Sequence, residues 1–247
     1  MNCTIDEKIY QEFRKALNAT NVFGCEKEYV ELYNLGYALL DRMEKCVGYI
    51  NAHTMIPNSE EEFLLLMMYG SMVVDAVKLV LHLLEVEHPY TRDSQTTYSY
   101  FADVCEEHNL ILPDGKIPTD DKVWEYIRSL SFAHPFETSR AKFLKKGETQ
   151  YSPAIIPYAE PQLWQTNAEP TIDVMIYSTA FPEIKHLNIP YDRIIGYIGS
   201  RYQLLSLGTE KIKQIIEEKK QEWAKQKVQV STNPVSYTHL TLPTNSR

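Results

Sequence analysis

One stretch of the sequence places two chemically capable side chains in an apolar setting, residues 120–140, DDKVWEYIRSLSFAHPFETSR. It contains Arg128 within a predicted helix and His134 directly before Pro135. A guanidinium binds anions through several donors, and histidine is the side chain that exchanges protons near neutral pH. No other stretch brings two residues capable of chemistry together among so many apolar neighbours.

The geometry of this pair depends on where its helix ends. Arg128 and His134 are six positions apart, which on an ideal helix separates them by about 240° around the axis. A residue before proline is disfavoured in the α conformation, so Pro135 predicts that the helix ends at Phe132 or Ala133. That break permits the imidazole to turn back toward the guanidinium. The buried face of the helix is predicted from apolar residues at helical spacing, Val123, Trp124, Ile127, Leu130 and Phe132.

The composition is that of an ordinary soluble globular protein. Of 247 residues, 44% are hydrophobic and 23% charged, enough for a sizeable core in one large domain or one domain with an appendage. The formal net charge of −8 argues against broad nonspecific nucleic-acid binding but permits a local basic site. The four cysteines lack paired or metal-binding spacing, and no signal peptide is visible, so we expect a cytoplasmic protein.

Helical periodicity covers most of the first 146 residues. The pattern predicts helices near residues 4–17, 26–51, 63–84, 98–109 and 120–133, and a short basic helix over 138–146. Ser59 is the expected N-cap of the third helix, and Thr119 or Asp120 that of the helix carrying Arg128.

The third predicted helix is long and apolar enough to cross a bilayer. However, Ser71, Asp75, Lys78 and His82 form one polar stripe along it, and a membrane span would carry such a stripe only with partners. We therefore predict the central helix of a bundle and no membrane contact. The His82-x-x-Glu85 pair reverses the Glu-x-x-His order of di-metal bundles, so we predict no metal site and no cofactor.

The pattern changes after residue 147. Repeated prolines exclude a long helix, and short extended segments are predicted at 154–158 and 171–177. Helices resume at 191–205 and from 209 to about 226. Residues 234–247 contain VSYTHLTLPT, which looks like a translated sequencing-library adapter, and we exclude them from the fold.

The Arg128-x5-His134 spacing resembles the Arg-x4–6-His motif of the HEPN superfamily, all-α domains of bacterial toxin and defence ribonucleases. The resemblance covers residues 1–146. The motif also has the position typical of the family, late in the helical region and near the end of an apolar helix. One departure is Ser129, because the family often has asparagine or another polar amide after the arginine.

This resemblance implies a metal-independent endoribonuclease of toxin or phage-defence type, or its inactive relative. His134 would act as general base or acid on the RNA 2′-hydroxyl, and Arg128 would hold the phosphate and stabilise the growing charge. Arg140 and Lys142, with neighbouring lysines, would add phosphate contacts. The implied partners are an RNA substrate, a second copy of the chain, because the family builds its cleft between protomers, and an antitoxin or other protein.

A noncatalytic alternative stays open: a helical module that dimerises or binds a partner protein. Arg128 would then form a helix-surface ion pair, His134 would cap a helix end, and the lysines would form a solvated face. The two hypotheses differ in structure. Catalysis requires Arg128 and His134 to face one open cleft, whereas an Arg128 tied to carboxylates favours the noncatalytic module.

The predicted fold class is mainly α, a helical bundle of about five helices with a small β ribbon insertion and a C-terminal helix. We expect the HEPN-like bundle over residues 1–146 and a small mixed segment, with the ribbon and a helix, over 147–207. A charged terminal helix and tail would follow over 208–233, and the adapter-derived artefact over 234–247.

Overall fold

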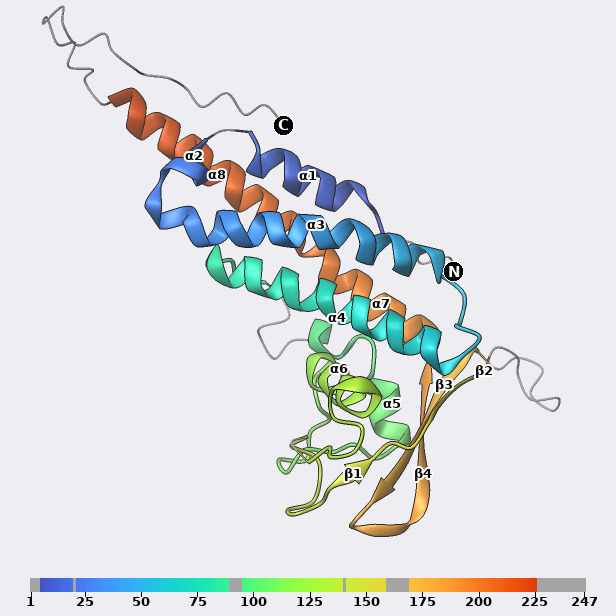
Figure 1. The fold of residues 1–247 in the computed structure, drawn as a ribbon. Helices are drawn as coiled ribbons and strands as arrows, with labels where there is room; N and C mark the ends of the chain where they lie inside the picture. The colour runs from blue at the N-terminus through green and yellow to red at the C-terminus, as the bar shows by residue number, and fades with distance from the viewer. Residues whose placement is uncertain (1–4, 20, 89–94, 140, 159–168, 226–247) are drawn as a thin grey trace, which may run out of the picture.

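The computed structural model describes residues 5–19, 21–88, 95–139, 141–158 and 169–225 (Figure 1). Its long helices are α1 (Lys8–Leu17), α3 (Val30–Ala52), α4 (Glu60–Leu83), α7 (Tyr191–Gln203) and α8 (Leu205–Lys225). They pack lengthwise against one another, with α7 and α8 behind α3 and α4, and a β-sheet with two shorter helices lies below them (Figure 1). The short ones are α2 (Val22–Cys25), α5 (Ala102–Glu107) and α6 (Asp120–Arg128).

Helix α4 is the centre of the molecule. Its N-cap is Ser59, as predicted, because the Ser59 hydroxyl accepts a hydrogen bond from the Glu62 amide at 3.3 Å. Gly70 lets α7 approach closely, since a Cβ there would lie 2.5 Å from Ile198 Cδ1. Among the described residues α4 is the one helix long and apolar enough to span a membrane. Half of its apolar 18-residue stretch is buried within the protein.

The polar stripe of α4 has partners on α6. Asp75 pairs with Arg128 at 2.9 Å, and Lys78 pairs with Asp121 at 3.1 Å. These contacts explain how an otherwise apolar helix carries charges, because each charge meets an opposite one where α4 faces α6. They also fix α6 against the helical layer.

The sheet is antiparallel, with β3 (Thr171–Ser178) at its centre. On one side β3 pairs with β4 (Phe181–Pro190) in a hairpin, and on the other with β1 (Gln150–Tyr151) and β2 (Ile155–Tyr158). Val174 faces Leu187 in the β3–β4 register, and Ile172 faces Ile189. All four of these side chains are buried and extend the core below α4 and α7.

The predicted fold class, a mainly α bundle of about five helices with a small β ribbon, is wrong. Helix dominates, but a four-stranded antiparallel sheet makes the fold mixed α/β. Strands β2 and β3 match the two predicted extended segments, whereas β4 was not predicted. It begins and ends near prolines and is mostly exposed along its first half, so it lacks alternation, and as an edge strand it tolerates proline.

The basic helix predicted over residues 138–146 is also wrong, since the described residues of this segment form turns. The backbone of Thr138 instead exchanges hydrogen bonds with that of Gln150, at 2.9 and 2.8 Å. This bridge holds the start of the segment extended. Periodicity cannot reveal such a contact, because the partner lies twelve residues further along the chain.

Candidate functional site

Helix α6 ends in a π-helical segment, Ser129–Ala133, that sets the relation between Arg128 and His134. Arg128 is the last residue of α6, and the His134 amide donates to the Ser129 carbonyl at 2.9 Å. This i→i+5 bond closes a wider turn than an α-helix has. The helical segment thus ends at Ala133, one of the two positions predicted from Pro135, but through a π turn that changes the angle between the two side chains.

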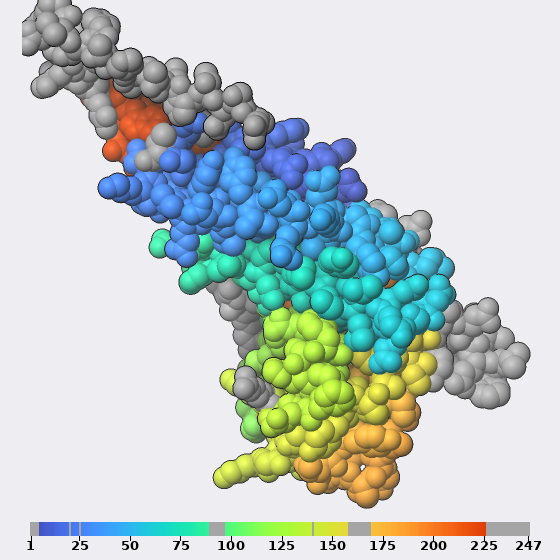
Figure 2. Space-filling view, in the orientation of Figure 1, coloured from blue at the N-terminus to red at the C-terminus, as the bar shows by residue number. Residues whose placement is uncertain are grey.

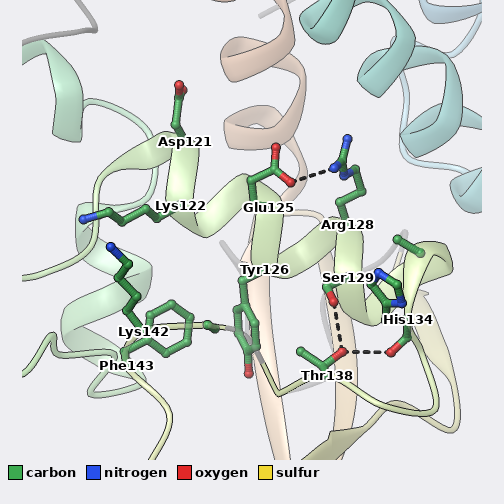
Figure 3. Close-up of a pocket in the computed structure, with 12 residues that line it drawn as sticks. Asp121, Lys122, Glu125, Tyr126, Arg128, Ser129, His134, Thr138, Lys142 and Phe143 are labelled. Carbon is green, nitrogen blue, oxygen red and sulfur yellow. Dashed lines mark hydrogen bonds and ion pairs between the residues drawn. The ribbon is translucent and has the colours of Figure 1, made fainter.

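Arg128 and His134 line the same open cavity, whose volume is about 430 Å³. Figure 3 shows both side chains on one side of it, with His134 below the stem of Arg128. Lys142 lines the same cavity. The structure therefore brings together three of the four predicted site residues, and Arg140 lies outside the described residues.

The Arg128 guanidinium is held by two carboxylates. It contacts Asp75 on α4 through Nη1 at 2.9 Å and Glu125 through Nη2 at 2.7 Å. Its side chain is 26% exposed, whereas those of Asp75 and Glu125 are about half exposed, at 52% and 48%. Arg128 is thus both part of the cavity wall and part of an ion-pair cluster, which combines the features assigned above to the catalytic and noncatalytic hypotheses.

The backbone at His134 is fixed by a short polar chain. The buried Thr138 hydroxyl donates to the His134 carbonyl at 2.9 Å and lies 3.1 Å from the Ser129 hydroxyl (Figure 3). The imidazole itself is exposed. Ser129 therefore joins the π turn to the following loop. Thr138 was not predicted from the sequence, since hydroxyl residues are common in loops.

A buried charge network borders the cavity. Asp121 Oδ1 accepts from Arg201 Nε at 2.9 Å, from Arg201 Nη2 at 2.7 Å and from the Tyr197 hydroxyl at 2.8 Å. Arg201 is 1% exposed, and its guanidinium carbon lies 4.4 Å from the centre of the Tyr197 ring. Burial opposes ionisation of Asp121, but Arg201 and Lys78 outweigh it and lower the pKa of Asp121. Arg201 was not predicted from the sequence, because it lies 80 residues from Asp121.

Asp120 has a different role from the predicted N-cap. Thr119 occupies the N-cap position without a side-chain hydrogen bond. The buried Asp120 carboxylate instead accepts from the amides of Ser99, Tyr100 and Phe101, at 2.8, 3.2 and 2.9 Å. Burial raises the pKa of Asp120 despite these bonds. Asp120 therefore ties the start of α6 to the start of α5.

The floor of the cavity includes the Tyr126 ring. Its hydroxyl donates to Gln150 Oε1 at 2.5 Å, and Gln150 Nε2 donates to Glu148 at 2.8 Å. Burial raises the pKa of Tyr126, so the phenol stays neutral. Tyr126 is thus a structural link to the sheet. Across the described residues no group of three or more His, Cys, Asp or Glu side chains is arranged to hold a metal ion.

Comparisons with known protein families, with curated proteins and with solved structures found no match to this chain.

Proposed function

We propose that this protein is a HEPN-like, metal-independent endoribonuclease of toxin or phage-defence type, or an inactive relative of one. The supporting observation is that Arg128 and His134 line one open cavity, with Lys142 in its wall. An imidazole beside a guanidinium is the pairing that phosphodiester cleavage uses for proton transfer and for charge stabilisation. An RNA strand is the proposed substrate, and a second protomer and an antitoxin are proposed partners.

In the proposed reaction His134 takes the proton of a ribose 2′-hydroxyl. The 2′-oxygen then attacks the adjacent phosphorus, the bond from phosphorus to the 5′-oxygen breaks, and the leaving 5′-oxygen takes a proton from water. The products end in a 2′,3′-cyclic phosphate and a 5′-hydroxyl. Arg128 stabilises the charge on the phosphate oxygens. Deoxyribose has no 2′-hydroxyl, so the proposal predicts that DNA is not cleaved.

The ion pairs of Arg128 are compatible with this role. Asp75 and Glu125 are each about half exposed, and ion pairs at exposed positions contribute about 1 kcal/mol or less. A phosphate can form two parallel hydrogen bonds with the guanidinium and displace such partners. Arg128 is thereby kept ordered at the cavity before RNA binds.

The test is cleavage of mixed cellular RNA by the purified protein in the presence of a metal chelator. We expect cleavage by the wild type and its loss in His134→Ala and Arg128→Ala. His82→Ala is the matched control, because His82 is exposed on α4 and does not line the cavity. Circular dichroism and thermal melting confirm that each variant is folded. Equal cleavage by His134→Ala and the wild type would refute the proposal.

The second candidate is a noncatalytic dimerisation module, and two observations favour it. Arg128 is tied to two carboxylates. In addition, α4 exposes Leu65, Met68 and Leu79 by 42%, 40% and 46%, at a spacing that places them on one stripe. Residues of α3 and α4 also line a hollow of about 320 Å³, and Figure 2 shows these two helices side by side on an open face.

Light scattering tests the dimer. If two copies meet through α4, Met68→Glu yields a monomer, while Leu207→Glu, an exposed apolar position on α8, leaves the dimer intact. A monomeric wild type would refute dimerisation. A dimer without RNA cleavage would select the noncatalytic module over the nuclease.

A further inference from the structure

The cavity has two ends of different chemistry. Arg128 and His134 lie at one end, and the ammonium groups of Lys122 and Lys142 converge at the other (Figure 3). Lys122 projects from the first turns of α6, and Lys142 from the turn segment that follows the π helix. Both side chains are exposed. Lys142 was predicted from the sequence as a phosphate contact, whereas Lys122 was not.

The two lysines differ from the other cations near the cavity. Arg128 has two carboxylate partners, and Arg201 and Lys78 share Asp121. Within the described part of the chain, no ion pair is formed by Lys122 or Lys142. Two ammonium groups that approach each other without a counter-charge repel, and an anion placed between them removes that repulsion.

The carboxylates that line the cavity do not supply this anion. Asp121 is engaged by Arg201 and Lys78, and Glu125 by Arg128. Each of these acids is thus neutralised by a base other than Lys122 or Lys142. The lysine end keeps a positive charge in a protein whose net charge is −8.

An aromatic side chain lies beside the lysines. Phe143 lines the cavity and is partly buried, and its ring meets that of Tyr126 edge-on, with 4.7 Å between their centres. Aromatic rings in basic grooves stack on unpaired bases of single-stranded nucleic acids. Bases within an RNA duplex are already stacked and cannot reach such a ring.

We propose that the cavity binds two neighbouring phosphates of a single-stranded RNA, with the reacting phosphate at Arg128 and His134 and a flanking phosphate between Lys122 and Lys142. The intervening nucleotide lies near Phe143. A cavity of about 430 Å³ lies within the roughly 300–1,000 Å³ of ligand pockets in general. This inference rests on the proposed function, since it names the substrate class and a second subsite of the same site.

The experiment measures binding of a short single-stranded oligoribonucleotide with 2′-O-methyl riboses, which cannot be cleaved because the 2′-hydroxyl is absent. Each phosphate is replaced in turn by an uncharged methylphosphonate. In the wild type we expect the replacement of one phosphate next to the reacting phosphate to weaken binding about 2- to 5-fold, which is the effect of losing one exposed charge pair. In the double variant Lys122→Met/Lys142→Met the same replacement should have no further effect.

Salt dependence gives a second readout. Loss of one phosphate contact on a single strand makes the negative slope of log K against log salt shallower by about 0.7. We expect this change in the double variant. The control is Lys45→Met, which removes an exposed lysine of α3 that does not line the cavity and should leave the pattern of methylphosphonate effects unchanged. If each methylphosphonate weakened binding to the double variant as much as to the wild type, the proposed subsite would be refuted.

The outcomes separate this inference from the proposed function. If the double variant loses the effect of one methylphosphonate but the wild type cleaves no RNA, the two-phosphate subsite stands and the nuclease proposal fails. If RNA is cleaved in a His134-dependent way without coupling at the lysines, the subsite alone fails. A duplex bound as tightly as the single strand would also refute the inference.

Discussion

Arg128 on α6 reaches across to Asp75 on α4, with Nη1 2.9 Å from Oδ2. This contact joins the candidate site to the central helix and holds the guanidinium at the cavity wall. It also places a carboxylate where the proposed function requires a phosphate. Under the proposed function, Asp75 therefore competes with RNA for Arg128.

Asp75→Asn should strengthen RNA binding. The substitution keeps the shape of the side chain but removes the competing charge, and an exposed ion pair of about 0.2–1 kcal/mol corresponds to an increase of up to about fivefold. Fluorescence anisotropy with the uncleavable oligonucleotide measures it. Asp41→Asn is the control, because Asp41 is exposed on α3 and does not line the cavity. Unchanged or weaker binding in Asp75→Asn would show that Arg128 does not hold the phosphate.

Asp121→Ala should destabilise the fold strongly. It removes the carboxylate that pairs with the Arg201 guanidinium, which is 1% exposed, and breaking a buried ion pair costs about 3–5 kcal/mol. Urea denaturation measures the free energy of unfolding. Asp103→Ala is the matched control, since it breaks an exposed pair with Arg193 and should cost about 1 kcal/mol or less. A similar loss in both variants would contradict the role assigned to Arg201.

Acid should weaken the fold partly through Asp121. The folded protein lowers the pKa of Asp121, so this group adds stability above its unfolded pKa, roughly pH 4, and loses it as pH falls through the lower folded value. Asp120, whose pKa is raised by burial, contributes with the opposite sign. The urea midpoint of the wild type should therefore fall more steeply below about pH 4 than that of Asp121→Asn. Parallel curves would contradict this linkage.

Thr138→Val should impair cleavage as well as stability. Without its hydroxyl, the contacts to the His134 carbonyl and the Ser129 hydroxyl are lost, at a cost of about 1–3 kcal/mol. A misplaced catalytic group lowers rates by up to about 100-fold, so we expect a loss of about tenfold or more in the rate of RNA cleavage. Thr149→Val, in the same region, is the control. Wild-type rates in Thr138→Val would mean that these hydrogen bonds do not position His134.

The local elements were largely predictable, because each depends on neighbouring residues. Ser59 capped its helix as expected, and the helical segment ends at Ala133, one of the two positions predicted from Pro135. The errors came from contacts between distant residues. The sheet was underestimated because β4 is an exposed edge strand, and the bridge between Thr138 and Gln150 replaced a predicted helix.

The same distinction applies to the site. The spacing of Arg128 and His134 identified two residues that share a cavity, although an ideal helix would have separated them. The π turn that changes their relation has no signature in the sequence. The partners Asp75 and Arg201 lie 53 and 80 residues from the side chains that they contact, so only the fold reveals them.

The most direct measurement of the central claim is cleavage of one RNA in chelator, compared with the same strand carrying a single 2′-deoxyribose at the cleaved nucleotide. The account predicts that the wild type leaves a 2′,3′-cyclic phosphate on the RNA and fails to cut the substituted strand there. It also predicts that His134→Ala cuts neither. Cleavage of the substituted strand at that position, unchanged cleavage by His134→Ala, or no cleavage of any RNA by the wild type would contradict the proposed catalytic site.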